Sequence, residues 1–322
     1  MYIANYNNCW FTNVGEGFID IGVQYLFTKL QKRCPEIRFG TLSSMSQYYL
    51  RNIRGYNSYS MVNLDEMQRK AESHGVLLRD YFCPDLYLFP GMFASDRFSE
   101  ETCVSRQFGE YINEHGGRVA FIGLGAEKYT DDERRNFLNS IKKLNPLFII
   151  TRDKKTYEMY YNYVECKKGL DCAFWVNDGF NPKGIKHKSY VISTFNRSDE
   201  PLNIATHLEY IHPWHMQYTL TIEKTRYLAK KNLMISDSPF DYITWYANAE
   251  KVYTDLVHAT IISLLYGTPV KYYQIDSRKD AFESLSYITT DDQGFMRLDI
   301  EKLEEEKKAI EQYILMRLNE IK

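Results

Sequence analysis

Two side chains that could handle anions stand where an apolar segment of strand length gives way to a polar or helical one. His258 follows the apolar segment Lys251–Thr254 and falls in the first turn of an expected helix, Leu256–Tyr266. The amide groups and the dipole at a helix start favour an anion and disfavour a protonated histidine. An anion bound beside His258 would hold its proton and make it a general acid. The alternative is a histidine that completes a core hydrogen bond.

The second of these side chains, Arg152, directly follows the apolar segment Leu147–Thr151. An arginine at the carboxyl end of a strand can hold a carboxylate or a phosphate in bidentate fashion. The alternative is that Arg152 and Asp153 form a pair that caps the next helix. The sequence therefore predicts an anion site at these strand ends. A nucleotide-sugar glycosyltransferase could use the same helix start for its phosphates.

A third stretch, Asn13-Val14-Gly15-Glu16-Gly17, precedes an expected helix Phe18–Leu30. Glycines between a strand and a helix allow the backbone to approach a ligand closely. We expect Asn13 and Gly15 near a bound substrate, and either Glu16 or Asp153 as the group that accepts a proton from it. Gly123-x-Gly125 lacks the third glycine of a dinucleotide fingerprint, so we do not expect NAD.

Two histidines three residues apart, His212 and His215, are expected at a loop–helix junction before the helix Trp214–Lys231. Such a pair could ligate a metal, but no cysteine or carboxylate has a matching spacing, so we expect no metal. The remaining roles for these two histidines are a contact to the substrate and a structural cap.

These residues need a scaffold in which strands alternate with helices. Expected strands in the first half are Ile37–Leu42, Leu86–Phe89, Val119–Gly123 and Leu147–Thr151, with helices Glu101–Glu114 and Asp131–Leu144. Expected strands in the second half are Ser189–Thr194, Leu233–Ser236, Lys251–Thr254 and Val270–Ile275, with a further helix Pro239–Ala247. This alternation predicts α/β structure with parallel, doubly wound sheets.

The boundary between the halves is expected near residue 180, where Gly, Pro and Asn crowd together. Residues 1–180 and 181–322 would then form two Rossmann-like domains facing a cleft, and the cleft would hold the ligands. The tail Asp299–Ile321 is an amphipathic helix with apolar residues at helical spacing, and we expect it to cross back onto the first domain. Asp255 is the expected N-cap of the helix Leu256–Tyr266, and Gly267 is expected to end that helix.

The composition narrows the class of protein. Of the 322 residues 44% are hydrophobic and 25% charged, and the net charge of −2 argues against a nucleic-acid binder. Twenty-seven tyrosines and 18 phenylalanines would suit a carbohydrate partner. The six cysteines form no CxxC pair, and the first residues do not resemble a signal peptide. We expect a cytoplasmic protein with reduced, buried thiols, in contact with the inner face of the membrane only peripherally.

Taken in order, these stretches resemble the polysaccharide pyruvyl transferase family. Its opening Asn-x-Gly-Asp turn is similar to Asn13–Glu16, its Arg-Asp after a mid-chain strand to Arg152-Asp153, and its Leu-Asp-Pro/Cys-Ala-Phe segment to Leu170–Phe174. Its signature Thr-Asp-Arg-Leu-His, followed by a helix and Gly-x-Pro-Val, is similar to Thr254–His258 and Gly267–Val270. Its Tyr-Asp-x-Lys-like stretch is most similar to Ile275–Lys279. The signature arginine is replaced by Leu256, and the usual Gly-Gly-Gly by Pro90-Gly91-Met92.

The resemblance implies a GT-B-like fold of two Rossmann-like domains, phosphoenolpyruvate as co-substrate with no other cofactor, and a saccharide acceptor. The product would be a pyruvate ketal, for example a galactose 4,6-ketal, on a capsular or cell-surface glycan precursor that could be lipid-linked. His258 would be the general acid, and the donor would bind Arg152, Arg278, Lys279 and Arg197. A GT-B nucleotide-sugar glycosyltransferase and a non-catalytic glycan-binding protein are the alternatives.

Overall fold

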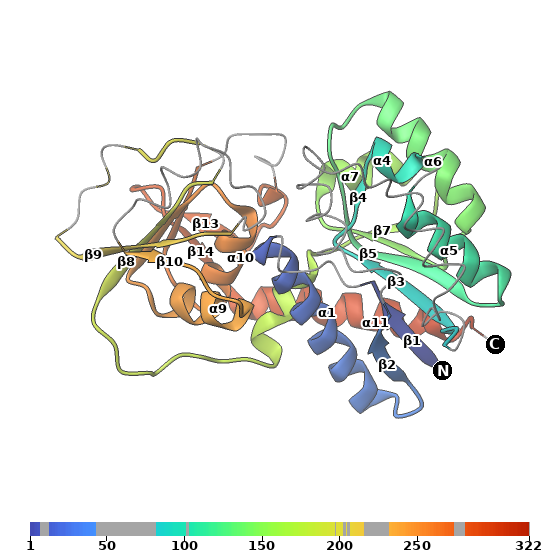
Figure 1. The fold of residues 1–322 in the computed structure, drawn as a ribbon, viewed down its shortest axis with the longest axis horizontal. Helices are drawn as coiled ribbons and strands as arrows, with labels where there is room; N and C mark the ends of the chain where they lie inside the picture. The colour runs from blue at the N-terminus through green and yellow to red at the C-terminus, as the bar shows by residue number, and fades with distance from the viewer. Residues whose placement is uncertain are drawn as a thin grey trace, which may run out of the picture.

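The computed structural model describes residues 1–6, 13–42, 82–100, 103–196, 198–201, 204, 207–215, 232–273 and 281–321. Within these ranges the chain forms two seven-stranded sheets, which Figure 1 shows side by side with helices packed around each. The mixed α/β class with parallel strands, expected from the alternation of apolar and helical segments, is confirmed.

The first sheet is parallel throughout. Its strands follow the order β2 (Arg38–Thr41), β1 (Tyr2–Asn5), β3 (Leu86–Pro90), β5 (Arg118–Ala126), β6 (Ile149–Thr151) and β7 (Cys166–Lys168), and β4 (Phe93–Ala94) also pairs with β5. Its helices are α1 (Val14–Arg33), α4 (Asp96–Ser99), α5 (Val104–Glu114), α6 (Asp131–Leu144) and α7 (Lys154–Tyr160). Alternate residues of β3 enter different apolar clusters, Leu86 and Leu88 on one face and Tyr87 and Phe89 on the other. The sheet is therefore buried on both faces.

The second sheet has a parallel part and an antiparallel edge. Its strand order is β10 (Leu233–Met234), β9 (Glu209–Pro213), β8 (Tyr190–Thr194), β11 (Lys251–Thr254), β12 (Val270–Tyr272), β14 (Met296–Leu298) and β13 (Ile288–Thr290). β14 runs antiparallel to both of its neighbours. Helices α9 (Pro239–Asn248) and α10 (Val257–Leu265) belong to this half. The short antiparallel pair was not predicted from the sequence.

In each sheet the strand order reverses at one point, between β1 and β3 in the first and between β8 and β11 in the second. Ligands of doubly wound proteins bind beyond the carboxyl ends of the strands at this reversal. The segments that leave these strands begin at Tyr6, Gly91, Phe195 and Asp255. The topology therefore marks two loci for a site before any side chain is considered.

Two expectations about where helices begin are wrong. Helix α1 begins at Val14 and not at Phe18, because Asn13 caps it by accepting a hydrogen bond from the Gly15 amide at 3.0 Å. Trp214 and His215 are not helical, since they follow directly on β9; residues 216–231 lie outside the described ranges.

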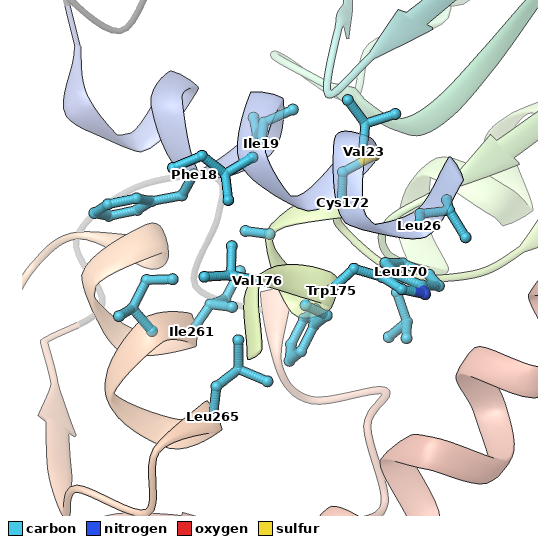
Figure 2. Close-up of a cluster of buried hydrophobic side chains, with 14 of the residues drawn as sticks. Phe18, Ile19, Val23, Leu26, Leu170, Cys172, Trp175, Val176, Ile261 and Leu265 are labelled. Carbon is cyan, nitrogen blue, oxygen red and sulfur yellow. The ribbon is translucent and has the colours of Figure 1, made fainter. Parts of the chain in front are cut away.

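The two sheets share one apolar core. The chain leaves the first sheet at Lys168 and enters the second at Tyr190, and between them lies the 3-10 helix η2 (Cys172–Asp178). Figure 2 shows side chains of α1, η2 and α10 meeting in this region, among them Phe18, Trp175 and Ile261. A Cβ on Gly22 would lie 1.9 Å from the carbonyl oxygen of Cys172, so only glycine lets α1 approach η2 this closely.

The terminal helix α11 (Ile300–Leu318) begins with the Asp299 side chain as its N-cap and runs from the second sheet to the first, where the two termini lie near each other (Figure 1). Near its end, Arg317 donates to the Leu147 carbonyl oxygen and pairs with Glu165, both at 2.6 Å. In its middle, Glu311 is 1% exposed and pairs with Lys29 and Arg33 of α1. Helix α11 therefore ties the second half to the first.

The structure describes five cysteines, and all five are free thiols. Of these five only Cys172 is buried as expected, and Cys83 is exposed. No helix within the described part of the chain combines the length and apolar character needed to cross a bilayer.

Candidate active site

A pocket of about 370 Å³ lies between the two halves. The first half contributes lining residues from the ends of β1 and β3 and from the starts of α1, α5 and α7, and the second half contributes the turn before α10 and the segments around Tyr272 and Phe282. In a parallel sheet the carboxyl end of each strand and the amino end of the next helix face the same side. Several helix N-termini, whose dipoles favour anions, therefore converge on this pocket.

His258 stands in the first turn of α10, as expected, and its side chain is 17% exposed. Its Nε2 atom is buried, lies 3.5 Å from Oδ2 of Asp171 and makes no hydrogen bond within the described part of the chain. The other edge of the ring faces helix α1, since a Cβ on Gly15 would lie 2.3 Å from Nδ1. The ring is thus held between a carboxylate and a glycine backbone.

Asp171 joins the two halves at this point. It precedes η2 and is 3% exposed, and its Oδ1 accepts a hydrogen bond from the Ala173 amide at 2.9 Å. Its Oδ2 accepts one from Nη1 of Arg152 at 3.3 Å. Burial alone would raise the pKa of Asp171, but His258, Arg152 and the Ala173 amide together lower it to about 2. The carboxylate is therefore ionised at neutral pH and faces both the imidazole and the guanidinium.

Arg152 follows β6 as predicted, and its guanidinium lies in a shaped slot. Its Cζ is 4.5 Å from the centroid of the Phe93 ring, and a Cβ on Gly125 would lie 2.3 Å from its Nε. Gly125 is therefore required for space beside Arg152, while Gly123, at φ +70°, lies at the irregularity between β5 and β6. Of the described residues that line the pocket, Arg152 alone carries a permanent positive charge.

The first turn of α1 supplies the other side of the pocket. Asn13 and Glu16 line it, and the Val14 amide donates to the His215 carbonyl oxygen at 3.1 Å, which ties α1 to the second half. Gly15 and Gly17 lie inside the helix and not before it, which corrects their expected place. The role of Gly15 is space for His258.

His212 and His215 have different surroundings. His212 lies in β9, where its Nδ1 donates to the Ser193 carbonyl oxygen at 3.0 Å, and it does not line the pocket. His215 does line it, but its Nε2 is 2.6 Å from the Tyr246 hydroxyl and the ring is 2% exposed. Burial, followed by the nearby His258, lowers the pKa of His215 to about 3. His215 is thus a neutral core histidine at neutral pH. His212 lies within a strand and not at the expected loop–helix junction, and the residues that follow His215 lie outside the described ranges.

Two carboxylates that line the pocket, Asp153 and Asp255, accept hydrogen bonds from backbone amides. Asp153 caps α7, with Oδ1 accepting from the Thr156 amide at 2.7 Å and Oδ2 from the Thr156 hydroxyl at 2.8 Å. Asp255 was expected to cap α10, but Leu256 is the N-cap residue and no side chain caps that helix. Asp255 instead accepts hydrogen bonds from the amides of Asn196 and Ser198. The start of α10 is therefore left without a side-chain cap.

The other residues expected to bind the donor substrate lie outside the described residues: Arg197, Arg278 and Lys279. Their described neighbours belong to the site region. Asn196 and Ser198 are held by Asp255, which lines the pocket, and Tyr272 and Ala281 line it themselves.

Sequence reasoning missed two parts of this arrangement. Asp171 was noted only as part of a motif, although an aspartate directly before the apolar segment Cys-Ala-Phe-Trp-Val was a visible signal. Tyr129, which lines the pocket from the segment after β5, carried no signal in the sequence pattern.

Comparison with known proteins identifies a family. The family model described as polysaccharide pyruvyl transferase matches residues 16–271. Among curated proteins, none matches the chain.

Solved structures share the fold. The structure of S. aureus MnaA with UDP has a TM-score of 0.54 at 11% identity, covering 88% of this chain and 81% of that one. A putative UDP-N-acetylglucosamine 2-epimerase from Listeria monocytogenes has 0.53 at 11%, with the same two coverages. UDP-GlcNAc 2-epimerase from Neisseria meningitidis, bound to UDP-GlcNAc, has 0.50 at 11%, covering 88% and 86%. At this identity the similarity shows the fold alone, which is the expected GT-B arrangement.

Proposed function

Since the chain belongs to the polysaccharide pyruvyl transferase family, we propose that it moves pyruvate from phosphoenolpyruvate to two hydroxyls of a sugar in a glycan precursor. One observation carries the proposal: His258, Arg152 and the uncapped start of α10 meet at a single pocket between the halves. A donor with a phosphate and a carboxylate suits a guanidinium beside free helix amides. We propose Arg278, Lys279 and Arg197 as its further cationic partners.

His258 is proposed as the general acid, through Nδ1. Its Nε2 is buried against Asp171, so Nδ1, beside Gly15, is the nitrogen left for the donor. The Asp171 carboxylate beside the buried edge of the imidazole fixes the orientation of the ring. Asp171 is therefore a positioning residue, and it holds Arg152 in the same way.

The proposed reaction begins when His258 protonates the methylene carbon of phosphoenolpyruvate, which becomes the methyl group. The C2 carbon, now with oxocarbenium character, is attacked by one sugar hydroxyl, whose proton leaves to a base. The C2–O bond to phosphate then breaks and inorganic phosphate departs with the electron pair. The second hydroxyl attacks C2, gives its proton to the departing phosphate, which becomes hydrogen phosphate, and closes the ketal ring.

The base in this scheme is proposed to be Glu16. Glu16 lines the pocket from the first turn of α1, next to Gly15, which faces Nδ1 of His258, while Asp153 serves as the N-cap of α7. The scheme uses no metal and no cofactor other than the co-substrate. A galactose 4,6-ketal is the proposed product, and a lipid-linked precursor at the inner membrane face is the proposed setting.

The test incubates the protein with phosphoenolpyruvate and galactosyl, mannosyl or N-acetylmannosaminyl acceptors, and measures phosphate release and product mass. A gain of one pyruvate less one water on one acceptor supports the proposal and identifies the sugar. Phosphate release from none of them, together with tight binding of UDP or GDP by calorimetry, would favour a nucleotide-sugar glycosyltransferase. Glycan binding with neither result would leave a non-catalytic binding protein.

A further inference from the structure

Tyr129 reaches the pocket from a backbone conformation that is unusual for its residue type. It lies three residues beyond β5, lines the pocket and has φ +56°. A bulky residue is strained in the left-handed region, and such residues concentrate at functional sites when their surroundings hold them there. The relevant question is what holds Tyr129.

The restraint is a single buried carboxylate. Glu133 is 0% exposed and accepts hydrogen bonds from three successive amides: Glu127 at 3.0 Å, Lys128 at 3.0 Å and Tyr129 at 2.8 Å. The Glu133 amide in turn donates to the Thr130 side chain, the N-cap of α6, at 3.2 Å. Three amide donors on one carboxylate define the path of the turn and so the direction in which the Tyr129 side chain leaves it.

The ring of Tyr129 adds an aromatic surface to the part of the pocket lining that the first half supplies, whereas His258 and the start of α10 belong to the second half. A cation lies over each of two rings: Cζ of Arg152 is 4.5 Å from the Phe93 centroid, and Nζ of Lys155 is 5.8 Å from the Tyr129 centroid. A cation covers one face of a ring, and Tyr129 is half-buried whereas Tyr6 is only 4% exposed, so part of the Tyr129 ring is accessible in the pocket. Aromatic rings at a binding surface pack well against the C–H face of a sugar.

We propose that Tyr129 is the platform against which the acceptor sugar ring packs, and that Glu133 is the positioning residue that holds it there. This rests on the proposed function and deepens it by naming the acceptor class. A pyranose with an axial 4-hydroxyl presents the hydrogens of C3, C4 and C5 on one face, a contiguous apolar surface that matches a flat ring. A β-galactoside therefore fits Tyr129 better than a β-glucoside, whose C4 hydrogen points to the other face.

The first experiment replaces the ring. Tyr129→Ala raises the acceptor KM for a β-galactoside by about 10-fold or more, while Tyr129→Phe stays within about threefold of the wild type. The donor KM and the kcat at saturating acceptor change little in both. Tyr161→Ala is the matched control, because Tyr161 is 48% exposed, stacks on Tyr157 and does not line the pocket. An acceptor KM that is unchanged in Tyr129→Ala would overturn the proposal.

The second experiment separates positioning from general stability. Glu133→Gln raises the acceptor KM severalfold in the wild-type background but causes no further rise in the Tyr129→Ala background, because Glu133 acts through Tyr129. Additive effects on KM in the two backgrounds would remove Glu133 from the proposal. Thermal melts of all variants show how much stability each change removes, and only the KM cycle reports on positioning.

A binding measurement keeps this inference distinct from the reaction itself. Ligand-observed NMR with methyl β-galactoside and methyl β-glucoside, with and without phosphoenolpyruvate, is recorded for the wild type, Tyr129→Ala and Tyr161→Ala. Tyr129-dependent binding that favours the galactoside supports the platform even if no phosphate is released, a result in which the transfer reaction alone fails. Binding that is equal in the wild type and Tyr129→Ala, or no glycoside binding by the wild type, refutes it.

Discussion

Nε2 of His258 lies 3.5 Å from Oδ2 of Asp171, although His258 follows a strand of the second sheet and Asp171 follows the last strand of the first. The same carboxylate oxygen accepts a hydrogen bond from Arg152. The proposed acid and the proposed anion-binding residue are thus aligned by one buried group. Because that group stands at the junction of the halves, the site exists only when both halves are folded against each other.

Replacing Asp171 by Asn should lower turnover while leaving the protein folded. In the wild type Asp171, with its pKa held at about 2, is ionised at neutral pH and lies beside both Nε2 of His258 and Nη1 of Arg152. The amide keeps the size of the side chain but removes the charge that positions the imidazole and the guanidinium. We expect kcat to fall by about 10-fold or more with an unchanged circular dichroism spectrum. A kcat equal to that of the wild type would show that Asp171 positions neither group.

His258→Ala should reduce turnover by about two to four orders of magnitude, the range of a positioned acid, with the fold intact by circular dichroism. Gly15→Ala tests the same group without removing it, since the new Cβ would lie 2.3 Å from Nδ1 and displace the ring. Its turnover should fall by at least about 10-fold. Gly40→Ala is the control, because its Cβ would meet nothing closer than the Tyr2 ring at 3.6 Å. An undiminished rate in folded His258→Ala would exclude the acid assignment.

Arg152→Lys should raise the KM for phosphoenolpyruvate by about 10-fold or more, and Arg152→Ala further, because an ammonium cannot form the bidentate contact or stack on Phe93. The acceptor KM should change much less. Arg135→Ala provides the matched loss of a guanidinium at a 71% exposed position. If donor affinity survived in Arg152→Ala, the anion site would have to be placed elsewhere in the pocket.

The stability of the protein should fall as the pH is lowered from 7 to 5, in part because of His215. Burial lowers the pKa of His215 to about 3 in the folded chain, whereas an exposed histidine has a pKa of about 6.5. Between these two values the unfolded chain binds a proton at this residue and the folded chain does not. The contribution of this residue is complete above about pH 6.5 and is reduced by about 2 kcal/mol at pH 5.

Urea unfolding of His215→Gln at both pH values should show a smaller difference than the wild type, by about that amount. His187→Gln, at an exposed histidine, should retain the wild-type difference. Equal differences in all three proteins would mean that His215 is not the group responsible.

Glu311→Gln should destabilise the protein by about 1–3 kcal/mol in urea unfolding, since it removes the carboxylate that lies 2.8 Å from Lys29 and weakens the contact to Arg33. Burial alone would lower the pKa of Lys29, but its contacts with Glu311 and Asp178 raise it, and the Asp178 carboxylate at 3.1 Å remains in the variant. Glu305→Gln, on the exposed side of the same helix, should change stability by less than about 0.5 kcal/mol. Equal effects at the two positions would show that the pairing does not hold α11 in place.

The parts of the fold that were predicted well are those with local signals. Helix α6 was predicted to the residue, and its ends are indeed local in origin, with Thr130 as its side-chain N-cap and Asn145 in the left-handed region at its end. Helix α10 was predicted to within one residue at each end, and Gly267 takes φ +72° just beyond it, as a helix stop should. The start of α1 was misplaced because glycine content was weighed above the cap that Asn13 provides.

The amino-acid sequence by itself determined the alternation of strands and helices, and with it the placement of His258 and Arg152 at the carboxyl ends of parallel strands. Those features follow from apolar periodicity and from helix caps, which act over a few residues. Tertiary structure alone decided that Asp171 faces both of them, that Gly15 and Gly125 provide their space, and that Asp255 holds a neighbouring loop and not its own helix. These relationships depend on distances between segments that are remote in the chain, and such distances are set by the packing of the two sheets around a shared core.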